Sequence, residues 1–280
     1  MKIKEFIRPK NLSEALGILD KYRDKAVILN GGTDIVREIS QQKIEPETIL
    51  YIQDIPELSY IRQDKDYIIF GGATTYSEIE ESRICIDLPV LSQAICEIGS
   101  PAIRSMGTPA GNIATAAPAA DCSVALLALD AFVVLASKAG ERTVKVEEIF
   151  VDKFKTIIKY NEIIKEIKIP VLEKERKSAF IKFARRKGQD TSQVSVGVSL
   201  NIEKNICQDI RISLGAVNPK PIRAYSLEKL MIGSEISDGL AKIKDVFPKE
   251  ATPRRTYKYL VTNTIIRRAI QKSIGGEQIG

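Results

Sequence analysis

The first fifty residues alternate between helical and strand patterns, and this alternation constrains the fold more than any other feature. Leu12–Tyr22 places apolar side chains at helical spacing, and Ser13 is suited to cap that helix. A short apolar strand follows at Ala26–Leu29, a helical turn at Ile35–Ser40 and a second strand at Thr48–Ile52. A strand, helix, strand order predicts a small parallel unit.

From Tyr60 onward the patterns alternate less regularly. Gly99–Asp121 is dense in alanine and glycine, so we expect this segment to be rich in loops. Val171–Ser178 is charged and follows a strand-ending proline, which makes it the best candidate for a domain boundary. The remaining patterns predict strands at Tyr67–Phe70, Ala131–Leu135, Glu162–Pro170, Val194–Ile202 and Ile210–Val217, and helices at Tyr76–Ser82, Leu88–Gly99, Ser123–Leu129 and Tyr257–Ile270.

The 280-residue chain contains no histidine, and this absence restricts its chemistry. It excludes Ser-His-Asp and Cys-His nucleophiles, histidine-ligated metals and an imidazole base. The four cysteines are never spaced as C-x-x-C, so we expect neither a metal or iron–sulfur site nor, in a reducing compartment, disulfides. We assign no catalytic side chain and expect a bound cofactor to carry the chemistry.

Charge and hydropathy indicate the compartment and exclude two kinds of partner. The formal net charge is +6, but the basic residues are scattered and form no long run, which argues against a nucleic-acid partner. The N-terminus lacks the apolar core of a signal peptide. The most apolar stretch, Val124–Ala136, is interrupted by Asp130 and is too short to span a bilayer. We therefore expect a cytoplasmic protein that does not enter membranes.

Two glycine-rich segments are candidate phosphate sites. In Leu29–Asp34, glycines between a strand and a helix allow successive backbone amides to converge on an anion; a plain turn is the alternative. Gly107–Asp121 contains Thr, Asn and Gly donors with an Asp at its far end, and would alternatively be an ordered loop with helix-capping residues. Two such sites suit a pyrophosphate, and hence a dinucleotide that performs its own redox chemistry.

At these residues the chain resembles a known family, the FAD-binding subunits of xanthine dehydrogenase, carbon monoxide dehydrogenase and related molybdenum hydroxylases. The motifs match in order and spacing over nearly the whole chain, and this joint match is specific where each motif alone is not. The matching segments are Asn30–Asp34, Thr108–Asn112 with Pro118 and Asp121, Lys182–Asp190, Arg211–Arg223 and Tyr257–Ala269.

The resemblance implies an α+β fold and a division of the chain into domains. It implies a two-subdomain FAD-binding domain of the vanillyl-alcohol-oxidase-like kind at residues 1–172, with subdomains at about 1–55 and 56–172. An α+β domain similar to the C-terminal domain of the carbon monoxide dehydrogenase flavoprotein would occupy residues 173–280.

The resemblance also implies which residues bind FAD. Ile164 and Lys182 would lie near the isoalloxazine ring. Pro109 and Ala110 depart from the family pattern: proline lacks a backbone donor, and an alanine forced to positive φ would cost about 1–2 kcal/mol. The implied FAD-binding residues are Ile28, Leu29, Asn30, Gly31, Gly32, Thr33, Asp34, Ile35, Ile98, Thr108, Gly111, Asn112, Asp121, Ile164 and Lys182.

The implied function is electron transfer within a larger enzyme. Partner subunits would carry two [2Fe–2S] clusters and the molybdenum cofactor, and non-covalently bound FAD would pass electrons to NAD+ or another acceptor. Two alternatives stay open: a free-standing FAD oxidoreductase with its own small substrate, and a non-catalytic anion- or nucleotide-binding module. The basic segment Lys182–Asp190 would be either a solvated surface or a contact with the flavin domain or a partner protein.

Overall fold

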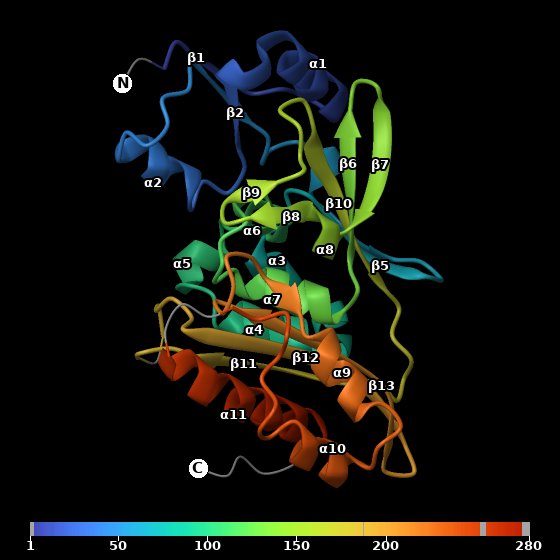
Figure 1. Cartoon of the computed structure of the whole chain (residues 1–280). Coiled ribbons are helices and arrows are strands. Elements are labelled where there is room, and N and C mark those ends of the chain that lie inside the picture. Colours follow the sequence, from blue (N-terminus) through green and yellow to red (C-terminus); the bar gives the residue numbers. More distant parts are fainter. Residues whose placement is uncertain (1–2, 187, 253–255, 276–280) are drawn as a thin grey trace.

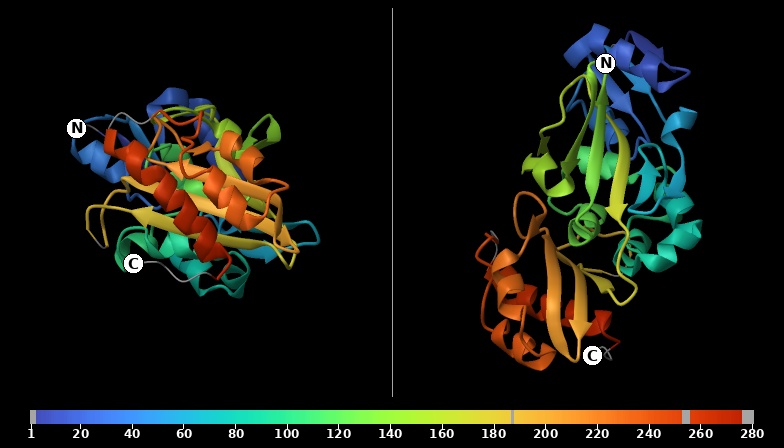
Figure 2. Two further views of the ribbon diagram at one scale, coloured as in Figure 1. Left: turned by 60° about the horizontal axis from the view of Figure 1, so that its bottom comes forward. Right: turned by 90° about the vertical axis from the view of Figure 1, so that its right-hand side faces the viewer.

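The structure is a computed structural model that describes residues 3–186, 188–252 and 256–275. Three sheets follow one another along an elongated molecule, with the first and the last helix at opposite ends (Figures 1 and 2). Beside them, β8 (Phe150–Asp152) and β9 (Lys155–Thr156) form a short two-stranded ribbon. Among the described residues, no helix has the length and apolar character needed to cross a membrane.

The first sheet is parallel throughout, which confirms the strand, helix, strand prediction. Ala15 and Leu19 of its first helix are fully buried in the apolar cluster under the sheet. The helix is capped by the side chain of Asn11 and not by Ser13, which lies within the first turn, so that prediction was wrong by two residues. The elements are β1 (Glu5–Ile7), β3 (Thr48–Tyr51) and β2 (Ala26–Leu29) in sheet order, with α1 (Leu12–Tyr22) and α2 (Ile35–Ser40).

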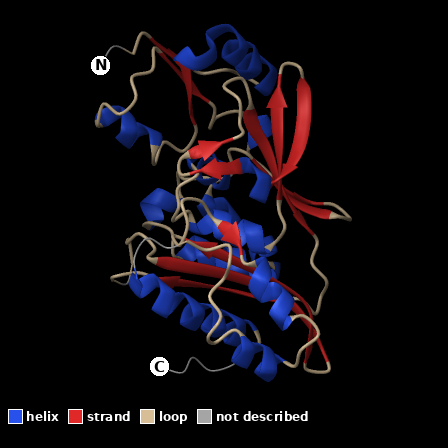
Figure 3. Cartoon of the chain, viewed as in Figure 1, coloured by secondary structure: helices blue, strands red, loops and turns tan. Residues whose placement is uncertain are grey.

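The second sheet is antiparallel, and helices cover one of its faces (Figure 3). Alternate residues of its strands, such as Phe70 and Val133, share one buried cluster with the helical residues Leu91 and Val124. The strands are β4 (Ile61–Gln63), β5 (Tyr67–Gly71), β10 (Ile163–Pro170), β6 (Phe132–Ser137) and β7 (Gly140–Lys145) in sheet order, and the helices are α3 (Tyr76–Glu81), α4 (Pro89–Cys96), α5 (Pro101–Arg104), α6 (Pro109–Thr115), α7 (Asp121–Ala128) and α8 (Val146–Ile149).

The third sheet is also antiparallel and lies between two layers of helices. Helices α4 and α7 pack on one face, and the long C-terminal helix crosses the other (Figure 1). Gly197 allows this approach, because a Cβ built there would lie 3.2 Å from the carbonyl oxygen of Val124 in α7. The elements are β11 (Lys177–Phe183), β12 (Val194–Glu203), β13 (Ile206–Gly215) and β14 (Ile222–Arg223) in sheet order, with α9 (Tyr225–Met231), α10 (Ile236–Lys242) and α11 (Thr256–Ser273).

The segment expected to be rich in loops, Gly99–Asp121, also contains two short helices, which the sequence patterns did not predict. Ser100 and Thr108 cap these helices with their side-chain oxygens, and a proline occupies the first helical position of each. Proline is favoured there because the missing N–H would have no intrahelical partner. The alanine content that suggested a loop favours helix once such caps are in place.

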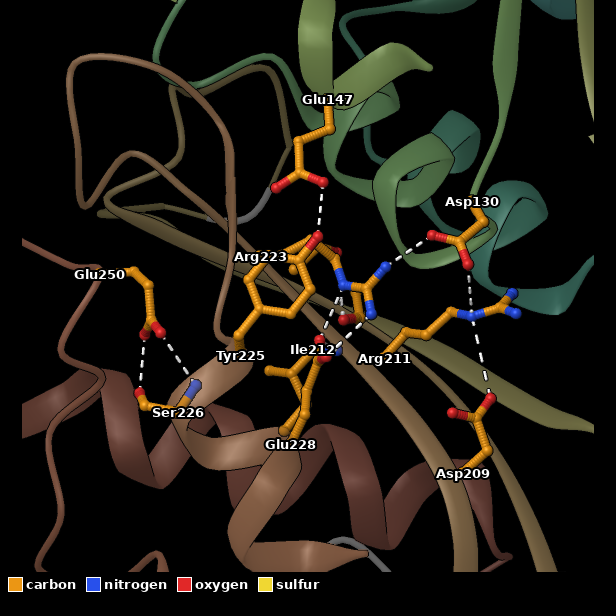
Figure 4. A network of polar contacts seen from close by, with 12 residues as sticks. Asp130, Glu147, Asp209, Arg211, Ile212, Arg223, Tyr225, Ser226, Glu228 and Glu250 are labelled. Atoms are coloured by element: carbon orange, nitrogen blue, oxygen red, sulfur yellow. Dashed lines mark hydrogen bonds and ion pairs between the residues drawn. The ribbon is translucent and has the colours of Figure 1, made fainter.

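A network of charges joins the third sheet to helix α7 (Figure 4). Arg223 donates to Asp130, which follows α7, at 2.6 Å and to both carboxylate oxygens of Glu228 at 2.7 and 2.8 Å. Arg211 pairs with the other oxygen of Asp130 at 2.9 Å. Because Arg223 is buried and fully paired, this network holds the two parts of the chain in one arrangement.

Candidate functional site

A cavity of about 550 Å³ opens between the first sheet and the helices that cover the second sheet. Its size falls in the range of small-molecule and cofactor sites, roughly 300–1,000 Å³. Both apolar side chains and polar groups, including Thr and Asn side chains, line it. The lining residues are Ile28, Asn30, Gly31, Gly32, Thr33, Asp34, Ile35, Glu38, Ile52, Tyr76, Ile98, Ile103, Thr108, Ala110, Gly111, Asn112, Ala114, Thr115, Phe154, Ile158, Glu162, Ile163 and Ile164.

The loop between β2 and α2, residues 30–34, provides unpaired donors at this cavity. Gly32 has a φ of +74°, a left-handed conformation that favours glycine. A Cβ built on Gly31 would lie 1.8 Å from the carbonyl oxygen of Met106, so the loop packs there without room for a side chain. Within the described part of the chain, no backbone N–H of residues 31–34 donates a hydrogen bond. Such a group of free amides is suited to bind an anion.

The side chain of Asn30 ties this loop to the second glycine-containing segment. Its amide nitrogen donates to the carbonyl oxygen of Gly72 at 2.8 Å and to the hydroxyl of Thr108 at 3.0 Å. The two segments, 78 residues apart in the sequence, are therefore held on neighbouring walls of one cavity.

The second segment is the N-terminal part of α6 rather than a loop. Thr108 caps the helix by accepting from the N–H of Gly111 at 2.9 Å, and Pro109 is the first helical residue. Ala110 lies inside the helix and has no positive φ, so the strain considered from the sequence does not arise. The side-chain oxygen of Asn112 accepts from the N–H and hydroxyl of Ser123, which fixes α6 against α7.

A second cavity of about 1,100 Å³ adjoins the first, beside α2 and the connection between α6 and α7. It shares Asp34, Glu38, Asn112, Thr115 and Phe154 with the first cavity. Its other polar walls come from the connections before β12 and after β13. The basic residues that line it are Arg37, Lys43, Lys153, Arg185 and Lys258.

Comparison with known proteins decides the family. The family described as the FAD binding domain in molybdopterin dehydrogenase matches residues 1–172, and the CO dehydrogenase flavoprotein C-terminal domain matches residues 179–273. This chain belongs to the FAD-binding subunits of the molybdenum hydroxylases. The flavoprotein subunit is thus part of an oxidoreductase, and the resemblance seen in its sequence is confirmed.

Individual relatives agree with this assignment over most of their length. The subunit is 33% identical over 245 residues to the glyceraldehyde dehydrogenase medium chain of Sulfolobus acidocaldarius, covering 87% of this chain and 85% of the relative. It is 32% identical to the nicotinate dehydrogenase FAD-subunit of Eubacterium barkeri, covering 85% and 82%. Carbon monoxide dehydrogenase from Hydrogenophaga pseudoflava contains a chain with a TM-score of 0.90 and 25% identity, covering 97% of both chains.

The structure brings most of the sequence-predicted residues of the flavoprotein subunit together around the first cavity. Leu29, Asp121 and Lys182 are the exceptions, since they line neither cavity. Leu29 ends strand β2. The predicted residues that line the first cavity are Ile28, Asn30, Gly31, Gly32, Thr33, Asp34, Ile35, Ile98, Thr108, Gly111, Asn112 and Ile164.

Asp121 and Lys182 form a buried ion pair with each other. The ammonium of Lys182 lies 3.0 Å from one carboxylate oxygen of Asp121, and the hydroxyl of Ser192 donates to the other at 2.6 Å. Lys182 also donates to the carbonyl oxygen of Glu97, the residue before the cavity-lining Ile98. The pair therefore joins helices α7 and α4 to strand β11. In the neighbouring basic segment, Arg185 is largely exposed and pairs with Asp190, and Lys187 lies outside the described residues.

Sequence reasoning missed several cavity residues. Tyr76 follows a helix cap, and Phe154 sits in the β8–β9 ribbon, which no sequence pattern predicted. Ile158 and Glu162 come from the connection that leads into β10. Glu162 begins the strand predicted at Glu162–Pro170 and lies two residues before the predicted Ile164, which could have pointed to it. Phe154 and Ile158 lie outside the predicted strands and carry no periodic signal.

The residues of the flavoprotein subunit fit FAD. Unpaired N–H groups at 31–34 suit a pyrophosphate, and the space around Gly31 excludes a Cβ. The part of the lining made by Ile98, Ile163 and Ile164 is apolar and suits a flat ring system. Burial raises the pKa of the Cys122 thiol to about 12 beside the phenol of Tyr76, so this thiol stays protonated near neutral pH.

Proposed function

We propose that the flavoprotein subunit holds FAD non-covalently in the first cavity, with the pyrophosphate against residues 30–34 and 108–112 and the isoalloxazine ring against the apolar wall. The observation that carries this proposal is that the unpaired N–H donors at 31–34 line the same cavity as the apolar residues Ile98 and Ile164. When bound, FAD supplies the redox chemistry, because a flavin can exchange single electrons as well as hydride. The protein's own contribution is to bind and orient the ring and to limit its contact with water.

The subunit's electron donor is proposed to be a partner subunit carrying [2Fe–2S] clusters, itself associated with a molybdenum-binding subunit. Support comes from family membership and from exposed apolar residues beside the cavity: Ile103, which also lines it, is 39% exposed, and Met106 is 55% exposed. Electron transfer needs close approach, so we place the iron–sulfur contact on residues 99–106. Exposed apolar side chains that lie together favour such a contact.

The acceptor is proposed to be NAD+ or another soluble oxidant, and the compartment the cytoplasm. A free-standing oxidoreductase with its own substrate is the less favoured function. Among the described residues that line the first cavity, no side chain is assigned as a general acid or base for a substrate. The basic second cavity is not assigned to nucleic acid, since it is recessed and small compared with a duplex.

An anaerobic experiment tests the division of labour. Substrate of the assembled enzyme should bleach the flavin absorption only when the iron–sulfur and molybdenum subunits are present, because the proposal assigns oxidation of the substrate to the molybdenum-binding subunit. NADH should bleach the isolated subunit if NAD+ is the acceptor. Bleaching by the hydroxylase substrate without partners would instead establish the free-standing oxidoreductase.

The proposed docking surface has its own test. Met106→Glu should weaken capture of the purified iron–sulfur subunit at least about tenfold, since it places a charge in an apolar contact. Ile232→Glu, at another exposed apolar residue near the C-terminal helices, is the matched control and should leave capture unchanged. If both variants capture the iron–sulfur subunit equally well, the contact does not lie at residues 99–106.

A further inference from the structure

The first cavity contains one buried carboxylate. The described residues contribute three acidic side chains to its wall, and of these Asp34 and Glu38 are partly exposed while Glu162 is 5% exposed. Glu162 directly precedes Ile163 and Ile164, so it belongs to the wall that suits the isoalloxazine ring. A buried charge at a ligand wall needs compensation, and its partners decide what field the ligand meets.

Arg142 supplies that compensation from the edge strand β7, which is separated from β10 by β6. Its guanidinium donates to one oxygen of Glu162 at 2.7 Å and to the other at 2.9 Å, a bidentate pair. The backbone N–H of Lys159 adds a third hydrogen bond at 2.8 Å. Burial opposes ionisation, but these three donors outweigh it, so the pKa of the Glu162 carboxyl lies below its usual range.

The pair also fixes the connection that enters β10. The second terminal nitrogen of Arg142 donates to the carbonyl oxygen of Ile157 at 3.1 Å as well as to Glu162. Ile158, the next residue, lines the cavity. Arg142 itself does not line it, so the positive charge stands behind the carboxylate. Of the two charged partners, the negative one therefore belongs to the cavity lining and the positive one does not.

We propose that the Arg142–Glu162 pair sets the reduction potential of the bound flavin and positions the 157–162 wall against it. The proposal rests on the location of FAD argued above. Reduced flavin carries more negative charge on its ring than oxidised flavin, so charges beside the ring shift the balance between the two forms. The ionised carboxylate disfavours the reduced form, and the guanidinium behind it partly cancels that effect. Glu162 and Arg142 are positioning and tuning residues, with opposite electrostatic signs.

Substitutions of the two partners should consequently shift the potential in opposite directions. Glu162→Gln keeps the shape and removes the negative charge, so the affinity for reduced relative to oxidised FAD should rise by about tenfold, which is about 30 mV upward for a two-electron couple. Arg142→Met leaves the carboxylate uncompensated and should lower the potential by a similar amount. Arg142→Lys keeps the charge and should restore a potential near wild type while still weakening FAD, because the bidentate fork is lost.

The experiment measures the potential of the FAD-loaded subunit by equilibration with reference dyes, and its FAD affinity by fluorescence. Glu166→Gln is the matched control, because Glu166 is equally buried and ion-paired on β10 but lines neither cavity. The reduction potential of the flavin in this variant should stay at the wild-type value. Far-UV circular dichroism establishes that each variant is folded. If Arg142→Met does not fold, the potential of Glu162→Gln is compared with that of Arg142→Lys. The first should lie above the wild-type value and the second near it.

The outcomes separate this inference from the proposed FAD site. Opposite shifts for Glu162→Gln and Arg142→Met, with none for Glu166→Gln, support the inference. Shifts of the same sign, or no shift in a folded variant, overturn it. If Gly31→Ala, in the loop with the unpaired N–H donors, leaves FAD affinity unchanged, the location of FAD is wrong. If Gly31→Ala weakens FAD while the potential is insensitive to both partners, only the tuning role fails.

Discussion

Lys182 lies 3.0 Å from Asp121, and this buried ion pair links the strand that opens the third sheet to the first residue of helix α7. Both side chains are less than a tenth exposed. Sequence resemblance had implied that both residues contact FAD directly. Their geometry assigns them first to holding helices α7 and α4 on the third sheet, so loss of either side chain should lower the stability of the fold.

Asp121→Ala should therefore destabilise the protein strongly. It leaves the ammonium of Lys182 buried without its counter-charge, which costs about 3–5 kcal/mol in comparable buried pairs. Urea unfolding measures the change. The double variant Asp121→Leu with Lys182→Met is the control and should recover much of the lost stability, because no uncompensated charge remains. A stable Asp121→Ala protein that has merely lost FAD would instead assign Asp121 to the cofactor.

Gly31→Ala should weaken FAD at least about tenfold. The new Cβ would overlap the backbone carbonyl of Met106, which cannot move without shifting the donors of residues 31–34. Gly17→Ala in helix α1 is the matched control: a Cβ there meets nothing within 4 Å, and helix stability should rise by about 0.5–1 kcal/mol with FAD affinity unchanged. Fluorescence titration with FAD distinguishes the two variants.

FAD should be released intact by acid precipitation. The chain has no histidine to form a covalent flavin link, and none of its four cysteines lines either cavity. The yellow colour should therefore appear in the supernatant when the holoprotein is precipitated with acid. Flavin absorption retained in the washed pellet would contradict non-covalent binding and point to a cysteine.

Acid should destabilise the protein partly through Glu166. Burial opposes its ionisation, but the hydroxyl of Tyr60 and the charges of Lys168 and Arg62 lower the pKa of the carboxyl below its ordinary value of 4.5. A lowered folded-state pKa stabilises the fold above pH 4.5, and this contribution is lost as the pH falls through the folded value. Glu166→Gln should flatten the dependence of the urea midpoint on pH below about 5. If the urea midpoint of the variant depends on pH as it does in the wild type, Glu166 does not contribute to the loss of stability in acid.

The sequence by itself determined the family, the cofactor and much of the local structure. Periodic apolar residues predicted α1 and the parallel strands, because a surface helix or strand must bury one face whatever lies beyond it. Gly31 and Gly32 indicated a special backbone conformation in the sequence itself, because close backbone packing at Gly31 and a positive φ at Gly32 leave few other residues possible. Both kinds of signal are local, and local signals are present in a single sequence.

Only the tertiary structure decided which polar groups meet. Lys182 and Asp121 are 61 positions apart and Arg142 and Glu162 are 20 apart, and neither pair is marked by any periodicity. From the sequence alone, the same charged residues are equally consistent with solvated groups on the surface. Their partners depend on how the second sheet, its helices and the third sheet pack. Burial then turns an ordinary Asp or Glu into a group that must be paired, because an isolated charge is too costly in the interior.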